Sequence, residues 1–198
     1  MTFFIRMFKE VIRINNFFWP HNPFNENQRE YLFVELFRNV LSKDEYFKQA
    51  FISIIKHLYE CDYDVDTGIF REMADKNHDY IEIYVKDQLG LLRTSKIVKR
   101  IHSQKEQPCY EIRINRNNEK PRVFFSTFIK PNGLSDCFGV WKGLLLCYGI
   151  SKNGNMEVDT NILTDELCQE THDLASEVEN NCFCQETINK YQITNFPD

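Results

Sequence analysis

The hydrophobic period of this chain changes once, near residue 79, and this change constrains the fold more than any other feature. Before it, apolar residues between positions 27 and 60 recur every three or four places, as in amphipathic helices. They form two runs: Leu32, Phe33, Leu36, Phe37, Val40 and then Phe47, Phe51, Ile54, Ile55, Leu58. Ser42 followed by Glu45 is typical of a capping box between them. We therefore predict a helical hairpin over 27–60.

After residue 79, apolar and polar residues alternate, which is the pattern of half-buried strands. Strands are predicted at 80–85, 110–114, 122–129 and 144–150. The basic stretch 92–101 is ambiguous and is interpreted as a short helix. Short turns such as Asn117-Asn118 favour antiparallel pairing. The fold class predicted is thus α+β, with N-terminal helices that include a hairpin, and an antiparallel sheet.

The C-terminal part is acidic and has helical spacing. Residues 165–180 are predicted to form a closing acidic helix, with Thr164 as its cap and Leu167, Leu174 and Val178 facing inward.

The whole chain, 1–198, is interpreted as a single domain. Within it, 1–78 is mainly helical, 79–180 holds the sheet and the closing helix, and 181–198 is an irregular tail.

The N-terminal segment favours a cytoplasmic protein. Residues 3–18 have apolar positions at helical spacing, but Arg6, Lys9, Glu10 and Arg13 interrupt them, unlike a secretory signal. The seven cysteines are odd in number and suggest no disulfide framework. No apolar run is long enough to span a membrane. The chain has 17 Phe, and the Phe-rich N-terminal region is a candidate oligomer interface.

Charge is distributed unevenly along the chain. The formal net charge is -5, yet residues 86–152 contain 13 Lys or Arg and only 5 Asp or Glu. Residues 153–198 contain 10 acidic residues and one basic residue, Lys190. A basic segment of this kind indicates an anionic partner, such as RNA or an acidic protein. The alternative is internal neutralisation, in which the acidic tail packs against or masks the basic sheet.

Strand alternation places the basic residues of this segment on one face. In the strand at 110–114, Glu111 and Arg113 share a face, and an antiparallel meander would bring Arg122 and Lys152 to it. Such cations, with Tyr148 as proton carrier, are what metal-free RNA cleavage requires. A face that is merely solvated is the alternative. Further basic residues are candidates for nucleic-acid binding: Arg93, Lys96, Lys99, Arg100 and Lys142.

The runs Tyr110–Arg113, Arg122–Phe125 and Leu145–Lys152, followed by a helix, resemble the C-terminal half of the RelE/HigB-like toxin superfamily. The resemblance covers roughly residues 105–180. It implies a cytoplasmic endoribonuclease of a toxin–antitoxin pair, with mRNA or the ribosome and an antitoxin as partners. It also implies that Arg113, Arg122 and Lys152 bind phosphate and act in catalysis, with no cofactor.

Two further patterns concern metal ions, and neither is assigned as a site. Cys168 and His172 share a helix face and precede Cys182 and Cys184, so zinc ligands and ordinary cysteines remain open alternatives. The segment 62–68 is similar to half of a calcium loop. Its sixth and twelfth positions lack the required Gly and Glu, which favours an acidic turn.

Two functions remain open from the sequence. A metal-independent endoribonuclease requires Arg113, Arg122 and Lys152 to converge in one concave, wet site. A non-enzymatic protein that docks nucleic acid or an acidic partner can have these cations dispersed, or paired with acidic residues of the tail.

Overall fold

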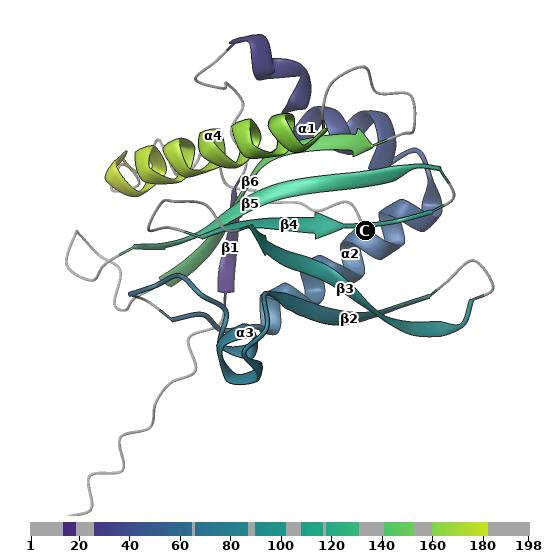
Figure 1. Cartoon of the computed structure of the whole chain (residues 1–198), viewed down its shortest axis with the longest axis horizontal. Coiled ribbons are helices and arrows are strands. Elements are labelled where there is room, and N and C mark those ends of the chain that lie inside the picture. Colours follow the sequence, from purple (N-terminus) through teal and green to yellow (C-terminus); the bar gives the residue numbers. More distant parts are fainter. Residues whose placement is uncertain are drawn as a thin grey trace, which may run out of the picture.

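The computed structural model describes residues 14–18, 26–64, 66–86, 90–101, 108–116, 118–130, 141–152 and 160–181. It is an α+β fold in which helices cover both faces of one sheet (Figure 1). The N-terminal helices lie on one face, and the C-terminal helix lies across the other. This confirms the fold class predicted from the change in hydrophobic period.

The sheet has six strands in the order β1-β6-β5-β4-β3-β2. Their bounds are β1 Ile14–Phe18, β2 Tyr80–Lys86, β3 Leu92–Ile101, β4 Cys109–Arg113, β5 Lys120–Lys130 and β6 Trp141–Lys152. From β2 to β6 each strand pairs antiparallel with the next, as predicted. The four strands expected from alternation are all present.

The interpretation of residues 92–101 as a short helix is wrong, because this segment is strand β3. It pairs with β2 on one side and β4 on the other, and Val98 lies opposite Ile112. A bulge between Ile81 and Glu82 shifts the register with β2. Ile97 and Val98 are both buried. The bulge interrupts the period of two, which explains why the sequence pattern is ambiguous here.

The helical spacing predicted over residues 3–18 is also wrong where the structure describes it. Residues Ile14–Phe18 form β1, which pairs in parallel with β6 at the edge of the sheet. The rest of that segment lies outside the described residues, as does the proposed Phe-rich interface apart from β1. Edge pairing with an existing strand offers backbone hydrogen bonds that local periodicity does not reveal.

The predicted hairpin is present, and its first arm is irregular. It consists of a 3₁₀ turn η1 (Glu26–Tyr31), a short helix α1 (Phe33–Leu36) and a π-helical turn η2 (Phe37–Leu41). The second arm is the regular helix α2 (Glu45–Glu60), and α3 (Arg71–Lys76) follows it. The predicted apolar face of α2 is buried.

The cap of α2 differs from the prediction. Asp44, not Ser42, is the N-cap, and its Oδ1 accepts hydrogen bonds from the backbone N–H groups of Tyr46 and Phe47. Ser42 instead donates its hydroxyl hydrogen to the Arg38 carbonyl, at the end of η2. Asp44 also pairs with Arg116 from the turn before β5. A carboxylate at this position interacts favourably with the helix N-terminus, which a hydroxyl does less well.

The closing helix α4 spans Thr160–Asn181 and so begins earlier than predicted. Thr164 therefore lies inside the helix and is not its cap. Leu167 and Leu174 are buried against the sheet, as predicted, while the side chain of Val178 lies outside the described residues. α4 packs on β5, β6 and β4 (Figure 1).

Both faces of the central strands are buried, which produces two apolar clusters. One lies under α1, η2 and α2, and the other lies under α4. The run Leu144 to Tyr148 in β6 is fully buried. Strands covered on both faces have continuous apolar runs rather than strict alternation.

The acidic segment after α2 forms the turn that the sequence favoured over a calcium loop. The Oδ1 of Asp64 accepts hydrogen bonds from the backbone of Asp66 and from the backbone and hydroxyl of Thr67. These bonds, first among them the Thr67 N–H, lower the pKa of Asp64. Gly68 has a positive φ of 67°, and its carbonyl accepts hydrogen bonds from the hydroxyls of Tyr110 and Thr127. The turn is thereby attached to the sheet.

Among the helices that the structure describes, none combines the length and the apolar character needed to cross a membrane.

Candidate functional site

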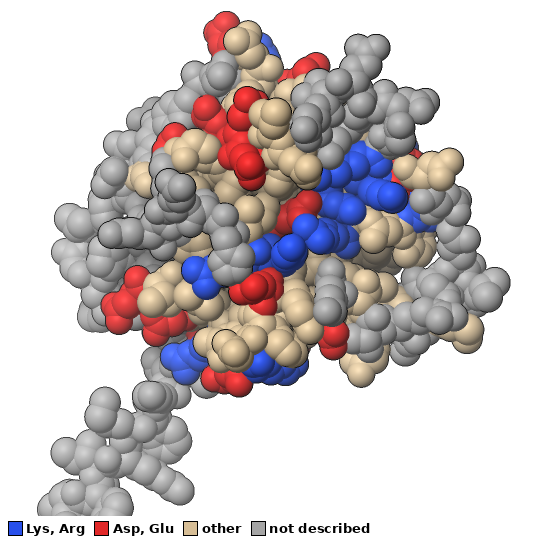
Figure 2. Space-filling view, in the orientation of Figure 1, with Lys and Arg blue, Asp and Glu red and all other residues tan. Residues whose placement is uncertain are grey.

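Strand register gathers basic side chains around one carboxylate on the face that carries α4. Lys99 lies opposite Glu111, and Arg113 lies opposite Arg122. Arg122 lies opposite Ile150, two residues before Lys152 in β6. Paired residues of antiparallel strands project from the same face. Figure 2 shows a band of Lys and Arg side chains across this side of the molecule, with acidic groups inside and beside it.

Glu111 is the centre of this arrangement, and only 1% of its side chain is exposed. Its Oε2 pairs with the Arg113 guanidinium, and its Oε1 lies 3.3 Å from Nε of Arg122. A buried carboxylate is stable only when it is paired and hydrogen-bonded. Glu111 therefore anchors two of the three cations predicted to be catalytic.

Arg122 is largely enclosed rather than facing an open site, and its catalytic role stays a prediction. Its side chain is 10% exposed, and it donates hydrogen bonds to the carbonyls of Ile114 and Pro121 and to Oδ1 of Asn115. Burial lowers its pKa, and Glu111 opposes this shift. Arg122 lies behind Glu111 as part of the structural support.

A cleft of about 220 Å³ opens beside Glu111. β3, β4 and the end of β6 line it on one side, and the first turns of α4 line it on the other. Its charged lining residues are four cations and two carboxylates: Lys99, Arg100, Arg113, Lys152, Glu111 and Asp165. Arg113 and Lys152 thus converge in one concave site as predicted, without Arg122.

Lys152 is the cation in the cleft whose ionisation is most perturbed. Its Nζ donates a hydrogen bond to Oγ1 of Thr164 on α4, at 3.1 Å. Burial lowers its pKa, the guanidiniums of Arg122 and Arg113 add to this, and Glu111 opposes it. An anion bound in the cleft would favour the charged form of Lys152.

Tyr148 does not line the cleft, and its role as a proton carrier stays a prediction. It is fully buried in the cluster under α4, opposite Phe124. Among the described residues its hydroxyl has no hydrogen-bond partner, and burial raises its pKa. Tyr148 lies on the same face of β6 as Ile150 and Lys152, as alternation indicates, and it is buried because α4 covers this part of the face.

The residues predicted to bind nucleic acid do not form one surface. Lys99 and Arg100 line the cleft. Lys142 lies at the other end of β6 from Lys152, roughly 33 Å away at the usual rise per residue. Arg93 and Lys96 belong to β3, but their side chains, like that of Lys142, lie outside the described residues.

Two charged residues of the cleft, Glu111 and Asp165, were not predicted from the sequence. Alternation places Glu111 on the same face as Arg113. A single acidic residue among the basic residues of that face indicates an ion pair. Asp165 was treated only as part of an acidic helix. Its position in the cleft depends on where α4 begins.

Cys168 and His172 face the sheet together, as their spacing predicted. They are buried near Cys109 and Cys147, while Cys182 and Cys184 lie outside the described residues. A hydrogen bond with Cys109 and the nearby His172 lower the pKa of Cys168 to about 6, against the effect of burial. Burial raises the pKa of Cys109. The zinc alternative for the set that includes Cys182 and Cys184 stays a prediction.

No family model matches the chain, and no curated protein or solved structure is significantly similar to it.

Proposed function

We propose that the cleft binds the phosphodiester backbone of RNA. The observation that supports this is the excess of positive charge in a partly buried concavity: four cations and two carboxylates line it, with Arg122 behind. A cleft with one sign of charge and protein walls concentrates counter-ions more strongly than an open surface. Its volume of about 220 Å³ suits a phosphate with part of its sugar rather than a whole folded partner.

The arrangement favours binding over cleavage. A metal-free nuclease needs groups that remove and donate protons next to the phosphate. Tyr148 is buried elsewhere, and Arg122 is committed to backbone carbonyls and Glu111. The non-enzymatic RNA-binding function is therefore the better supported of the two that the sequence left open.

Endoribonuclease activity of the toxin type remains a second proposal, with one observation in its favour. Lys152 lies in the cleft, and its lowered pKa makes it a better proton carrier at neutral pH than an ordinary lysine. In this proposal Arg113 holds the phosphate, Lys152 moves the proton, and the partners are mRNA on the ribosome and an antitoxin.

We expect the binding of RNA to depend on Lys99 and Lys152. The double variant Lys99→Gln, Lys152→Gln should weaken binding of a single-stranded oligoribonucleotide. It should also reduce the slope of log K against log[salt] by about 1.4, since each phosphate contact to a single strand contributes about 0.7. Fluorescence anisotropy at several salt concentrations measures both quantities.

Lys56→Gln is the matched control, because Lys56 is exposed on α2, on the opposite face of the sheet. An unchanged slope in the double variant, or an equal change with Lys56→Gln, would contradict the proposal. The same samples, incubated with labelled RNA and a metal chelator, test the nuclease. Cleavage that is lost in Lys152→Gln alone, while binding persists, would favour the enzyme.

The acidic helix α4 lies beside the basic cleft, so we expect it to weaken RNA binding. Asp165→Asn removes the carboxylate that lines the cleft and should tighten binding up to about fivefold at low salt, the range of a surface ion pair. Glu166→Gln is the control, since Glu166 is the next residue, is also exposed and does not line the cleft. Equal effects of the two variants would show that only net charge matters, and no effect of Asp165→Asn would refute masking by this residue.

A further inference from the structure

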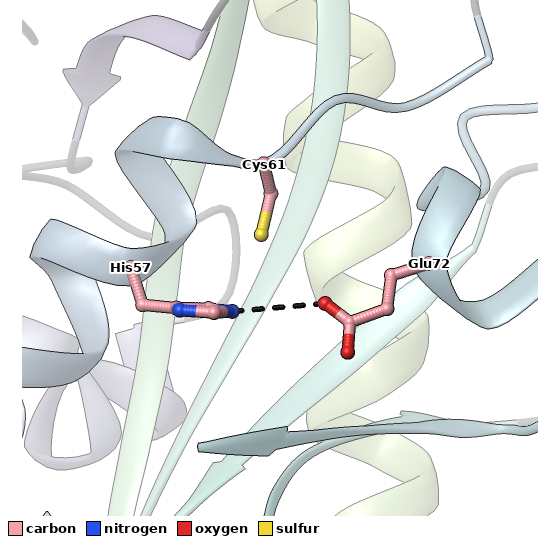
Figure 3. Close-up of side chains that lie close together, drawn as sticks. All are labelled: His57, Cys61 and Glu72. Carbon is pink, nitrogen blue, oxygen red and sulfur yellow. Dashed lines mark ion pairs between the residues drawn. The ribbon is translucent and has the colours of Figure 1, made fainter. Parts of the chain in front are cut away.

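Three side chains that can bind a metal ion converge at the end of α2, away from the cleft. They are His57, Cys61 and Glu72, and Figure 3 shows them facing one another. Their potential ligand atoms, one from each residue, all lie within 4.8 Å of one another. Nε2 of His57 and Oε2 of Glu72 are 3.7 Å apart. Among the described residues, this is the group in which three potential metal ligands lie this close together.

Helix geometry accounts for the convergence. His57 is in the last turn of α2 and Cys61 is its C-cap, so the two residues are one helical turn apart on the same side. The turn at 62–70 reverses the chain, and the antiparallel bridge between Tyr63 and Phe70 brings the first turn of α3, with Glu72, back beside them. The end of α2 also carries the negative pole of the helix, which attracts cations.

The imidazole of His57 supplies an independent indication of a ligand. Its Nε2 is shielded from solvent and has no hydrogen-bond partner within the described part of the chain. The Glu72 oxygen at 3.7 Å is too far for a hydrogen bond. A buried polar nitrogen without a partner destabilises a fold, unless another group binds it. The nitrogen points toward Glu72, and the Cys61 sulfur lies beside the line that joins them (Figure 3).

We propose that His57, Cys61 and Glu72 bind a Zn²⁺ ion. A thiolate, an imidazole and a carboxylate form a set that suits zinc rather than the all-oxygen preference of Ca²⁺ or Mg²⁺. In a tetrahedral zinc site, neighbouring ligand atoms are about 3.4–3.6 Å apart. Small side-chain rotations would bring the ligand atoms of the three residues to these distances. One thiolate and one carboxylate neutralise the ion.

The surroundings fit a bound cation. Lys76 donates to the other oxygen of Glu72, Oε1, at 2.8 Å, which holds the carboxylate while leaving Oε2 for the ion. Three protein ligands leave one tetrahedral position for water, and the side chains of His57 and Glu72 are 38% and 26% exposed. A bound ion would link the end of α2 to the start of α3.

Titration of the metal-free full-length chain with Co²⁺ tests the proposal. Cobalt replaces zinc in such sites and reports thiolate coordination through a charge-transfer absorption band. We expect one Co²⁺ per chain at this site, a thiolate band, displacement by Zn²⁺ but not by Mg²⁺, and a higher Tm with Zn²⁺. Cys61→Ser should abolish the band. His57→Gln should weaken metal binding by more than about 100-fold, because loss of a residue that only hydrogen-bonds to a metal ligand already weakens binding by up to about 100-fold.

The double variant Cys182→Ser, Cys184→Ser is the control, because these cysteines belong to the alternative zinc set that the sequence suggested. It should retain the band of the unmodified chain. If the band survives in Cys61→Ser and disappears in the control, the metal binds at the C-terminal cysteines and the proposal is wrong. Absence of any thiolate band, or binding weaker than about 1 mM, would equally overturn it. Far-ultraviolet circular dichroism verifies that each variant is folded.

Discussion

Glu111→Gln is expected to lower the free energy of unfolding by about 3 kcal/mol, because it removes the negative charge between two guanidiniums. Arg113 is 36% exposed and can turn toward solvent, so it contributes little to the loss. Arg122 is 10% exposed and would remain buried with an uncompensated charge. Breaking a buried ion pair from one side costs about 3–5 kcal/mol, and the amide oxygen of glutamine retains part of the hydrogen bonding. Urea unfolding monitored by circular dichroism measures the change.

Two further variants make this expectation specific. Glu119→Gln also removes one carboxylate, but from an exposed position in the turn before β5, and should change stability by less than about 0.5 kcal/mol. Adding Arg122→Met to Glu111→Gln removes the stranded charge and should recover much of the lost stability. If Glu111→Gln alone costs no more than Glu119→Gln, the buried ion pair does not stabilise the fold.

Phe70→Ala is expected to destabilise the chain by about 3–5 kcal/mol, the usual effect of truncating a buried phenylalanine. Phe70 is fully buried, and its ring centroid lies 4.9 Å from that of Tyr110, 5.8 Å from Tyr63 and 6.4 Å from Phe125. It therefore attaches the turn between α2 and α3 to β4 and β5. The alanine variant would leave a cavity between three aromatic rings that cannot collapse without moving the sheet.

Phe70→Leu and Tyr59→Ala complete this test by urea unfolding. The leucine variant keeps most of the apolar volume and should cost about 1–1.5 kcal/mol. Tyr59 is 45% exposed on α2, so its truncation should have a small effect. If Phe70→Ala and Tyr59→Ala destabilise equally, Phe70 does not hold the turn against the core.

Much of the fold could be predicted from the sequence, because local periodicity reports which side of an element is buried. The i, i+3/i+4 spacing of Phe47, Phe51 and Ile54 predicted α2, and the alternation of Tyr110, Ile112 and Ile114 predicted β4 and its apolar face, which packs in the cluster under α2. The shared face of Glu111 and Arg113 followed from the same period. So did the inward position of Leu167 and Leu174 on the closing helix.

Tertiary structure decided what periodicity does not encode. Leu92–Ile101 is a strand because β2 and β4 flank it, and Ile14–Phe18 is a strand because β6 offers it a free edge. Such hydrogen-bond partners are distant in sequence, so no local pattern reports them.

The residues of the candidate cleft were also predictable only in part from the sequence. Charge counting and alternation located Arg113 and Lys152 correctly, because both residues follow the regular pleat of their strands. Tyr148 lies on the predicted face but is buried because α4 covers it. Arg122 is enclosed because Glu111 and three oxygen acceptors surround it. The sequence determined which residues lie on which face. Strand register and the position of α4 determined which of them reach solvent, because burial and ion pairing depend on neighbours that only the folded chain brings together.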